Sequence, residues 1–156
     1  MQSYPNDSPE AMAQLLTALM AADDRIDDAE VEALGMLDAY ARIGITPPAF
    51  ADVLRDYFTG VDAAAGIDRV ERIGERITDS GTRVTLWEMM VGLAGADAEV
   101  NSAEAAFLER IAALWWNGVV PPRLPVPGSR SGQALPQSIL HPHAQIRMRH
   151  PWAIAR

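Results

Sequence analysis

Carboxylates are concentrated in the stretch AADDRIDDAE, residues 21–30, where five of the eight residues from Asp23 to Glu30 are acidic. Oxygen ligands at this density suit hard divalent cations such as Ca²⁺. The spacing fits the second half of a calcium-binding EF-hand loop, but the first and third loop positions would be Leu19 and Ala21, which offer no side-chain oxygen. An EF-hand is therefore excluded, and any cation must be held by ligands pooled from separate segments.

The acidic stretch occurs twice in the chain. Residues 19–37 align without gaps onto residues 93–111 at an offset of 74, and the apolar and acidic positions both coincide. The paired positions are Leu19 and Leu93, Ala22 and Ala96, Asp23 and Asp97, Ile26 and Val100, Asp27 and Asn101, Glu30 and Glu104, and Leu34 and Leu108. This pattern indicates an internal duplication of a helix, a short acidic turn and a second helix.

Helix capping explains part of each turn. Asp27-x-x-Glu30 and Asn101-x-x-Glu104 are both capping boxes, in which the first side chain accepts a hydrogen bond from a backbone amide in the first helical turn and the glutamate bonds back. Each cap stabilises its helix by about 1 kcal/mol. We therefore expect both turns to start a helix whether or not a cation binds.

Capping leaves Asp23, Asp24 and Asp97 unexplained, because they follow the C-terminal end of the preceding predicted helix. The negative end of the helix dipole lies there, so each carboxylate should cost up to about 1 kcal/mol. A bound divalent cation would convert this repulsion into coordination. The unfavourable placement occurs at matched positions in both copies, which favours a functional explanation.

Apolar residues recur at helical spacing along most of the chain, and no segment alternates with a period of two. We therefore expect an all-α fold, a compact bundle of about six helices joined by short connections. Of the two tryptophans that end the last helix, Trp115 and Trp116, we expect one to pack inward and the other to be half exposed. The helices are predicted at about residues 9–22, 27–44, 46–60, 64–77, 83–96 and 101–116.

The chain changes character after Asn117. Residues 118–156 hold seven of the eleven prolines, all three histidines and no acidic residue. This composition predicts a disordered tail, and a variant extension foreign to the body is the alternative. His141 and His143 have no third ligand nearby, so we do not expect them to hold a metal. Residues 1–9 are predicted to be a short N-terminal extension.

Charge and composition argue against several classes of function. Residues 1–117 contain all 21 acidic residues but eight of the thirteen arginines, a net charge of −13 that argues against nucleic-acid binding and suits divalent cations or basic partners. The chain has no cysteine or lysine and the body no histidine, so we expect no enzyme; metal-assisted hydrolysis is the one alternative. No signal peptide or apolar span is visible, and we expect a soluble, cytoplasmic protein without direct membrane insertion.

The two turns, each close to A-x-D-x-x-[IV]-[DN]-x-x-E, carry a family resemblance. Residues 10–117 resemble the TerB-like tellurite-resistance family, which is bacterial. The resemblance implies an all-helical domain whose two units pack by pseudo-symmetry and bring their acidic turns to a shared divalent-metal site. It also implies a role in tellurite and chemical stress resistance with protein partners, including membrane-associated stress complexes. The ligand candidates that it carries over are Asp23, Asp27, Glu30, Asp97, Asn101 and Glu104.

The chain departs from the family at Asp24 and Ala98, where glycine is usual. Two functions of different class remain. The first is a stress-response scaffold or sensor that binds a divalent cation of unknown identity through its paired acidic turns. The second is a purely structural protein–protein interaction module, similar to a co-chaperone, in which the turns act only as helix caps.

Overall fold

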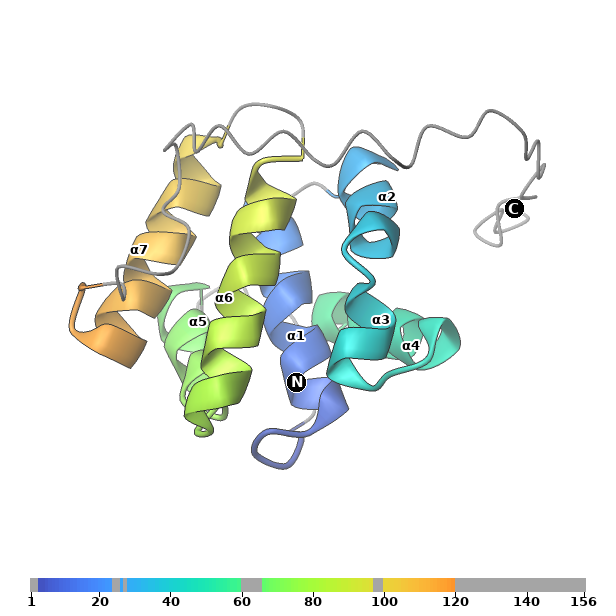
Figure 1. Ribbon diagram of the computed structural model, residues 1–156, viewed down its shortest axis with the longest axis horizontal. Coiled ribbons are helices and arrows are strands. Elements are labelled where there is room, and N and C mark those ends of the chain that lie inside the picture. The colour runs from blue at the N-terminus through green and yellow to red at the C-terminus, as the bar shows by residue number, and fades with distance from the viewer. Residues whose placement is uncertain (1–2, 24–25, 27, 60–65, 97–99, 120–156) are drawn as a thin grey trace.

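The computed structural model describes residues 3–23, 26, 28–59, 66–96 and 100–119. These residues form seven helices and no strand, so the predicted all-α fold class is confirmed (Figure 1). The helices are α1 (Pro9–Met20), α2 (Asp28–Met36), α3 (Ala39–Ile43), α4 (Pro47–Thr59), α5 (Gly66–Gly74), α6 (Ser80–Ala94) and α7 (Ser102–Trp116).

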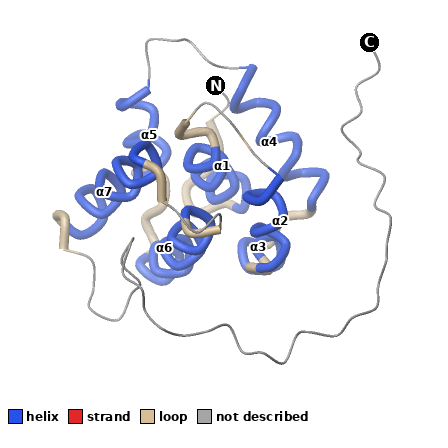
Figure 2. Tube along the Cα trace, turned by 90° about the horizontal axis from the view of Figure 1, so that it is seen from above, coloured by secondary structure: helices blue, strands red, loops and turns tan. Residues whose placement is uncertain are grey.

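The first helix, α1, lies at the centre of the bundle (Figure 2). It packs against α3, α4, α5, α6 and α7, and nine of its twelve residues are buried. A helix that is apolar on nearly every face can only be accommodated in this way. The predicted start at about residue 9 is confirmed. Ser8 caps the helix there, because its Oγ accepts a hydrogen bond from the amide of Ala11 at 3.1 Å, and Pro9 occupies the first helical position.

The single helix expected over residues 27–44 is two helices, α2 and α3. Asp38 has a left-handed backbone with φ of 51°, which an α-helix cannot accommodate, so the chain turns before α3 begins. The predicted end is correct, because Gly44 takes φ of 74° after α3. Val31 of α2 follows the apolar spacing of this segment, yet it is 40% exposed.

The segment expected to be an N-terminal extension packs against the body. Tyr4 is buried, its hydroxyl donates to Asp56 at 3.1 Å, and its carbonyl accepts from Arg76 at 2.6 Å. Burial, followed by the hydrogen bond to the Asp56 carboxylate, raises the pKa of Tyr4 to about 12. The core of the bundle therefore includes a residue that precedes α1.

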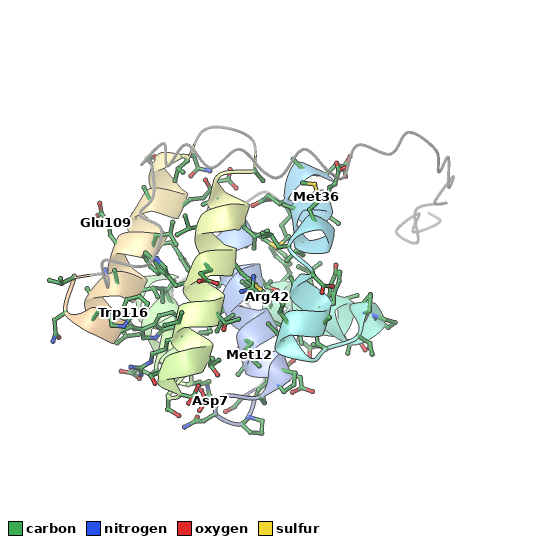
Figure 3. The ribbon with its side chains drawn as sticks, in the orientation of Figure 1. Asp7, Met12, Met36, Arg42, Glu109 and Trp116 are labelled. Atoms are coloured by element: carbon green, nitrogen blue, oxygen red, sulfur yellow. The ribbon has the colours of Figure 1, made fainter. Side chains whose placement is uncertain are left out.

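Asp7 joins this segment to the start of α6, at the base of the bundle in Figure 3. Its Oδ1 accepts hydrogen bonds from the amides of Thr78 at 2.7 Å and Asp79 at 3.1 Å, and its Oδ2 accepts from the Thr78 hydroxyl. Asp79 in turn caps α6 by accepting from the amide of Thr82 at 2.7 Å. Because of this cap, α6 begins at Ser80 and not at about residue 83 as expected.

The contact between α5 and α7 is close because Gly74 has no side chain. The indole nitrogen of Trp115 donates to the Gly74 carbonyl at 3.0 Å, and Trp115 is buried. Trp116 is half-buried and meets Trp87 edge to face at 5.4 Å between ring centroids. The expectation that one tryptophan packs inward and its neighbour stays partly exposed is confirmed.

Candidate functional site

The second acidic turn starts α7 with a complete capping box. Oδ1 of Asn101 accepts hydrogen bonds from the amides of Ala103 and Glu104, both at 2.9 Å. Oε2 of Glu104 accepts from the amide of Asn101 at 3.0 Å. Glu104 is 7% exposed, so the reciprocal bond lies where water competes little. The predicted cap is confirmed in this copy.

The first acidic turn is described only in part. Asp23 is an exposed residue in the turn that follows α1, and Glu30 lies half-buried in the first turn of α2. Asp24 and the predicted cap Asp27 lie outside the described residues. The matching capping box at Asp27 and Glu30 therefore stays a prediction.

The two acidic turns are positioned by the ends of four helices. The C-terminal ends of α1 and α6 and the N-terminal ends of α2 and α7 all lie at the upper end of the bundle in Figure 1. Helices α1 and α6 also pack directly against each other. Helix packing thus brings the duplicated segments to one end of the molecule, as the pseudo-symmetric arrangement implies.

A shared metal site stays a prediction. Within the described ranges, no three His, Cys, Asp or Glu side chains are grouped closely enough to hold a metal ion, and Asp97 and Ala98 of the second turn lie outside those ranges. The oxygens of Asn101 and Glu104 that cap α7 are also the oxygens that a cation would use. Coordination by these two residues would have to compete with capping of α7.

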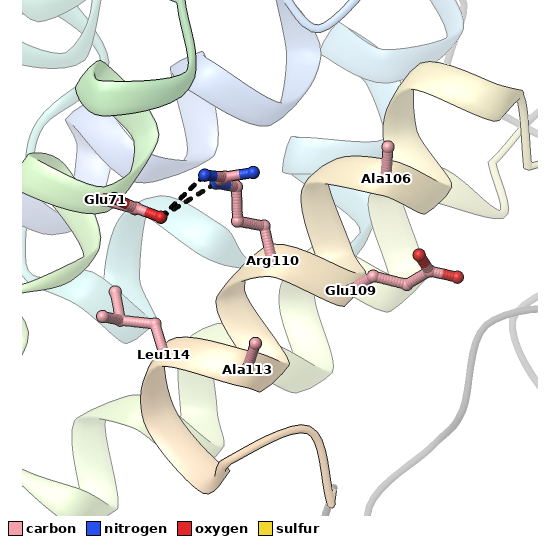
Figure 4. Close-up of a pocket in the computed structure, with 6 residues that line it drawn as sticks. All are labelled: Glu71, Ala106, Glu109, Arg110, Ala113 and Leu114. Carbon is pink, nitrogen blue, oxygen red and sulfur yellow. Dashed lines mark hydrogen bonds and ion pairs between the residues drawn. The ribbon is translucent and has the colours of Figure 1, made fainter.

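A second feature lies on another part of the surface, where an open groove of about 650 Å³ follows α7 beside α5 (Figure 4). Exposed Ala106 and Ala113 and half-buried Leu114 supply its apolar surface. Its charged lining residues are Glu71, Glu109 and Arg110. The sequence analysis did not identify this groove, because the small residues on α7 line a groove only when α5 packs beside them.

One buried cation, Arg69 of α5, has a structural role. Its guanidinium carbon lies 3.6 Å from the centroid of the Tyr57 ring, and its Nη2 donates to the Tyr57 carbonyl at 2.6 Å. Stacking on the aromatic face and a backbone acceptor together compensate for burial of this charge. The residue therefore ties α5 to the end of α4.

A known family model matches most of this chain. The family model described as "Tellurite resistance protein TerB" matches residues 9–115, which runs from the first residue of α1 almost to the end of α7. Searches of curated proteins and of solved structures find no match. In the part of the chain that the structure describes, every helix is too short or too polar to cross a membrane. The matched range includes six of the described helices, all but the last residue of α7 and both acidic turns, and the chain belongs to the TerB tellurite-resistance family.

Proposed function

We propose that this protein is a non-catalytic stress-response scaffold or sensor that binds a divalent cation through its paired acidic turns and contacts other proteins. Membership of a family described by tellurite resistance supports the stress-response role. The observation that supports a cation site is the position of α1 and α6, whose C-terminal ends lie at the same end of the bundle. Each is followed in the sequence by acidic residues that the negative helix end disfavours.

A cation at this end would act on α2. The helix begins directly after the first acidic turn and packs against α3 and α6. It also presents two exposed apolar side chains, Val31 at 40% and Met36 at 72% exposure. Exposed apolar side chains are a common feature of protein-binding surfaces. Cation binding to the preceding turn would thus bias the orientation of α2 and its contacts with a partner.

A specific observation also favours the second function, a purely structural interaction module. The capping box of Asn101 and Glu104 engages both side chains in hydrogen bonds to backbone amides at the start of α7. If the first turn works in the same way, four of the six candidate ligands serve the helices. Only Asp23 and Asp97 then distinguish the two functions.

Thermal unfolding in the presence of Ca²⁺, Mg²⁺, Mn²⁺ or Zn²⁺ tests the proposal. A cation at about 100 times its dissociation constant should raise the free energy of unfolding by about 2.7 kcal/mol. The double variant Asp23→Asn with Asp97→Asn should lose this shift. The matched control, Asp52→Asn with Glu75→Gln, removes two exposed carboxylates away from the turns and should keep it.

The outcomes separate the two functions. A native protein whose melting temperature moves with none of the four cations has no such site, and the structural module is then the better description. A shift that survives in the Asp23 and Asp97 double variant places the cation elsewhere. In either case Asn101→Ala should lower stability by about 1 kcal/mol, because the α7 cap is lost with or without a cation.

A further inference from the structure

Every exposed residue of α2 lies on one face of the helix. At about 3.6 residues per turn, the exposed residues fall within an arc of about 140°. They are Asp28, Val31, Glu32, Gly35 and Met36. The opposite side of the helix includes buried Ala33 and Leu34 and packs against α3 and α6. The exposed residues form a continuous surface about 13 Å long at about 1.5 Å per residue, which we call the α2 face.

The α2 face holds neighbouring exposed apolar side chains. Four large apolar side chains are exposed in the described part of the chain. Two of them, Val31 and Met36, lie at the two edges of the α2 face (Figure 3). The other two, Phe58 and Val119, lie singly on α4 and after α7. Single exposed apolar residues are common on any protein, whereas neighbouring ones are typical of a binding surface.

Gly35 lies within the α2 face and is not required by the packing of the described helices. A Cβ added at this position would meet no atom within 4 Å in the described part of the chain. Glycine inside a helix is less favourable than alanine, so this residue lowers stability without a packing reason. Such a departure from the local rule favours a functional explanation. The missing side chain lets the atoms of a partner approach the backbone of α2 closely.

Four residues of the α2 face have the spacing of a hole for a side chain of another helix. Asp28, Val31, Glu32 and Gly35 occupy positions i, i+3, i+4 and i+7. Four residues at this spacing surround an inserted side chain when two helices pack together. Val31 and the bare backbone at Gly35 make one side of the hole apolar, and the two carboxylates flank the other side.

The charge of the α2 face favours a cationic partner. Asp28 and Glu32 lie one turn apart, and neither forms an ion pair with another described residue. Like charges at this spacing repel each other, and α2 contains no basic residue that could offset them. A second copy of the same face would bring two more carboxylates. Anionic lipid and nucleic acid would be repelled in the same way, whereas arginine or lysine would relieve the repulsion.

We propose that the α2 face binds a basic amphipathic helix of a partner protein. An apolar side chain of that helix inserts beside Val31 and Gly35, and its arginine or lysine side chains pair with Asp28 and Glu32. The inference rests on the proposed function, which assigns contacts with other proteins, and it adds the location and the chemistry of the partner. It does not require a cation, because α2 presents this face while its opposite side packs against α3 and α6.

A synthetic helical peptide tests the α2 face. The probe consists of three seven-residue repeats with leucine at the first and fourth positions, arginine at the fifth and seventh, and alanine elsewhere. One control peptide has glutamate in place of arginine, and another has the composition of the probe with the leucines scattered around the helix. Each peptide is titrated into the isotope-labelled full chain in the presence of EDTA, so that cation binding does not contribute. The probe should shift the amide resonances of Val31, Gly35 and Met36, and neither control peptide should.

Gly35→Gln tests the hole without disturbing the fold. The space around this position is open, so the melting temperature of the variant should equal or exceed that of the native protein. The glutamine side chain fills the hole, and the affinity for the probe should fall about tenfold or more. Ala113→Gln adds the same side chain to an exposed position on α7 and should leave the affinity unchanged.

The two carboxylates are tested by a matched pair of double variants. Asp28→Asn with Glu32→Gln should weaken binding of the probe about fivefold, because two exposed ion pairs are lost. Asp52→Asn with Glu75→Gln makes the same change in net charge at exposed positions outside α2 and should keep the affinity within about twofold.

Several outcomes overturn the inference. It fails if the probe does not shift α2, if the peptide with scattered leucines binds as tightly as the probe, or if Gly35→Gln binds the probe as tightly as the native protein. Shifts in α2 that appear without peptide and grow with protein concentration would assign the face to a second copy and equally overturn it. Failure of the cation proposal is distinct, because a melting temperature that moves with no cation leaves the titration in EDTA unchanged.

Discussion

At the scale of single residues, the Asp7 carboxylate makes stability depend on pH. Burial acts to raise its pKa, but the hydrogen bonds from the Thr78 side chain and from the backbone of Asp79 and Thr78 outweigh burial and hold the pKa below the ordinary 3.8. A pKa that is lower in the folded than in the unfolded state stabilises the fold above the unfolded value. This contribution is lost as the pH falls through the folded value.

Asp7→Asn should therefore lower the free energy of unfolding by about 1 kcal/mol near neutral pH, and the difference from the native protein should shrink at pH values below 3.8. Asparagine tolerates the left-handed backbone at this position, where φ is 55°, so the variant removes the charge without adding backbone strain. Urea unfolding at a series of pH values measures the effect.

Asp52→Asn serves as the control, because its exposed pair with Arg55 should contribute less than about 0.5 kcal/mol. A difference between native protein and Asp7→Asn that stays constant with pH would show that the Asp7 charge is not involved.

Local and distant hydrogen bonds differ in how well the sequence predicts them. The capping box of Asn101 and Glu104 joins residues three apart, so its spacing identified it before the structure. The bond from Thr78 to Asp7 joins residues 71 apart, and no spacing rule applies at that separation. The groove beside α7 could not be predicted for the same reason, because Glu71 and Arg110, which pair in it, are 39 residues apart in the sequence.

At the scale of helices, Gly74 determines how closely α5 approaches α7. A Cβ at this position would lie 2.7 Å from Cδ2 of Leu114 and 3.0 Å from Cδ1 of Ile111. Gly74→Ala should therefore destabilise the protein by about 1 kcal/mol or more, because this overlap outweighs the better helix propensity of alanine at a helix end. Chemical unfolding of the variant measures the change.

A control and a double-mutant cycle show whether close packing is the cause. Gly35, in α2, has nothing within 4 Å of its added Cβ, so Gly35→Ala should stabilise the protein by about 0.5 to 1 kcal/mol. Leu114→Ala removes the nearest atom, and Gly74→Ala should cost less in that background than alone. Equal costs in both backgrounds would contradict the assignment to Leu114.

Helix existence was predicted better than helix boundaries. Apolar spacing identified a helical segment in every region that the structure shows as helical, because burial of one face imposes that spacing. It could not show the break between α2 and α3, since the apolar spacing continues through Leu37 while the left-handed backbone at Asp38 interrupts the helix. Val31 followed the spacing but lies 40% exposed, because the spacing does not state which neighbour covers a position.

At the scale of the whole molecule, the sequence predicted the paired units but not the position of α1. The repeat relates α1–α2 to α6–α7, yet α1 is surrounded by five helices and α7 lies at the edge of the bundle (Figure 2). Similar sequences therefore occupy different environments. A symmetric pattern in the sequence implies related geometry at the two turns, but it does not imply equal burial.

The central position of α1 predicts that the described helices unfold as one unit. Leu16 is fully buried in α1, so Leu16→Ala should lower the free energy of unfolding by about 2 to 5 kcal/mol. The buried tryptophans Trp87 and Trp115 lie on α6 and α7, so near-ultraviolet circular dichroism follows those helices while the far-ultraviolet signal follows all of them. Both transitions should shift together, since a small single domain unfolds cooperatively.

Met36→Ala is the matched control in this comparison, because Met36 is 72% exposed and its removal should change stability by less than about 0.5 kcal/mol. If Leu16→Ala moved the far-ultraviolet transition and left the tryptophan signal in place, α1 would not connect the two halves of the bundle. The packing of α1 against α6 and α7 would then be too weak to couple them, and a cation bound at the acidic turns would act on one half alone.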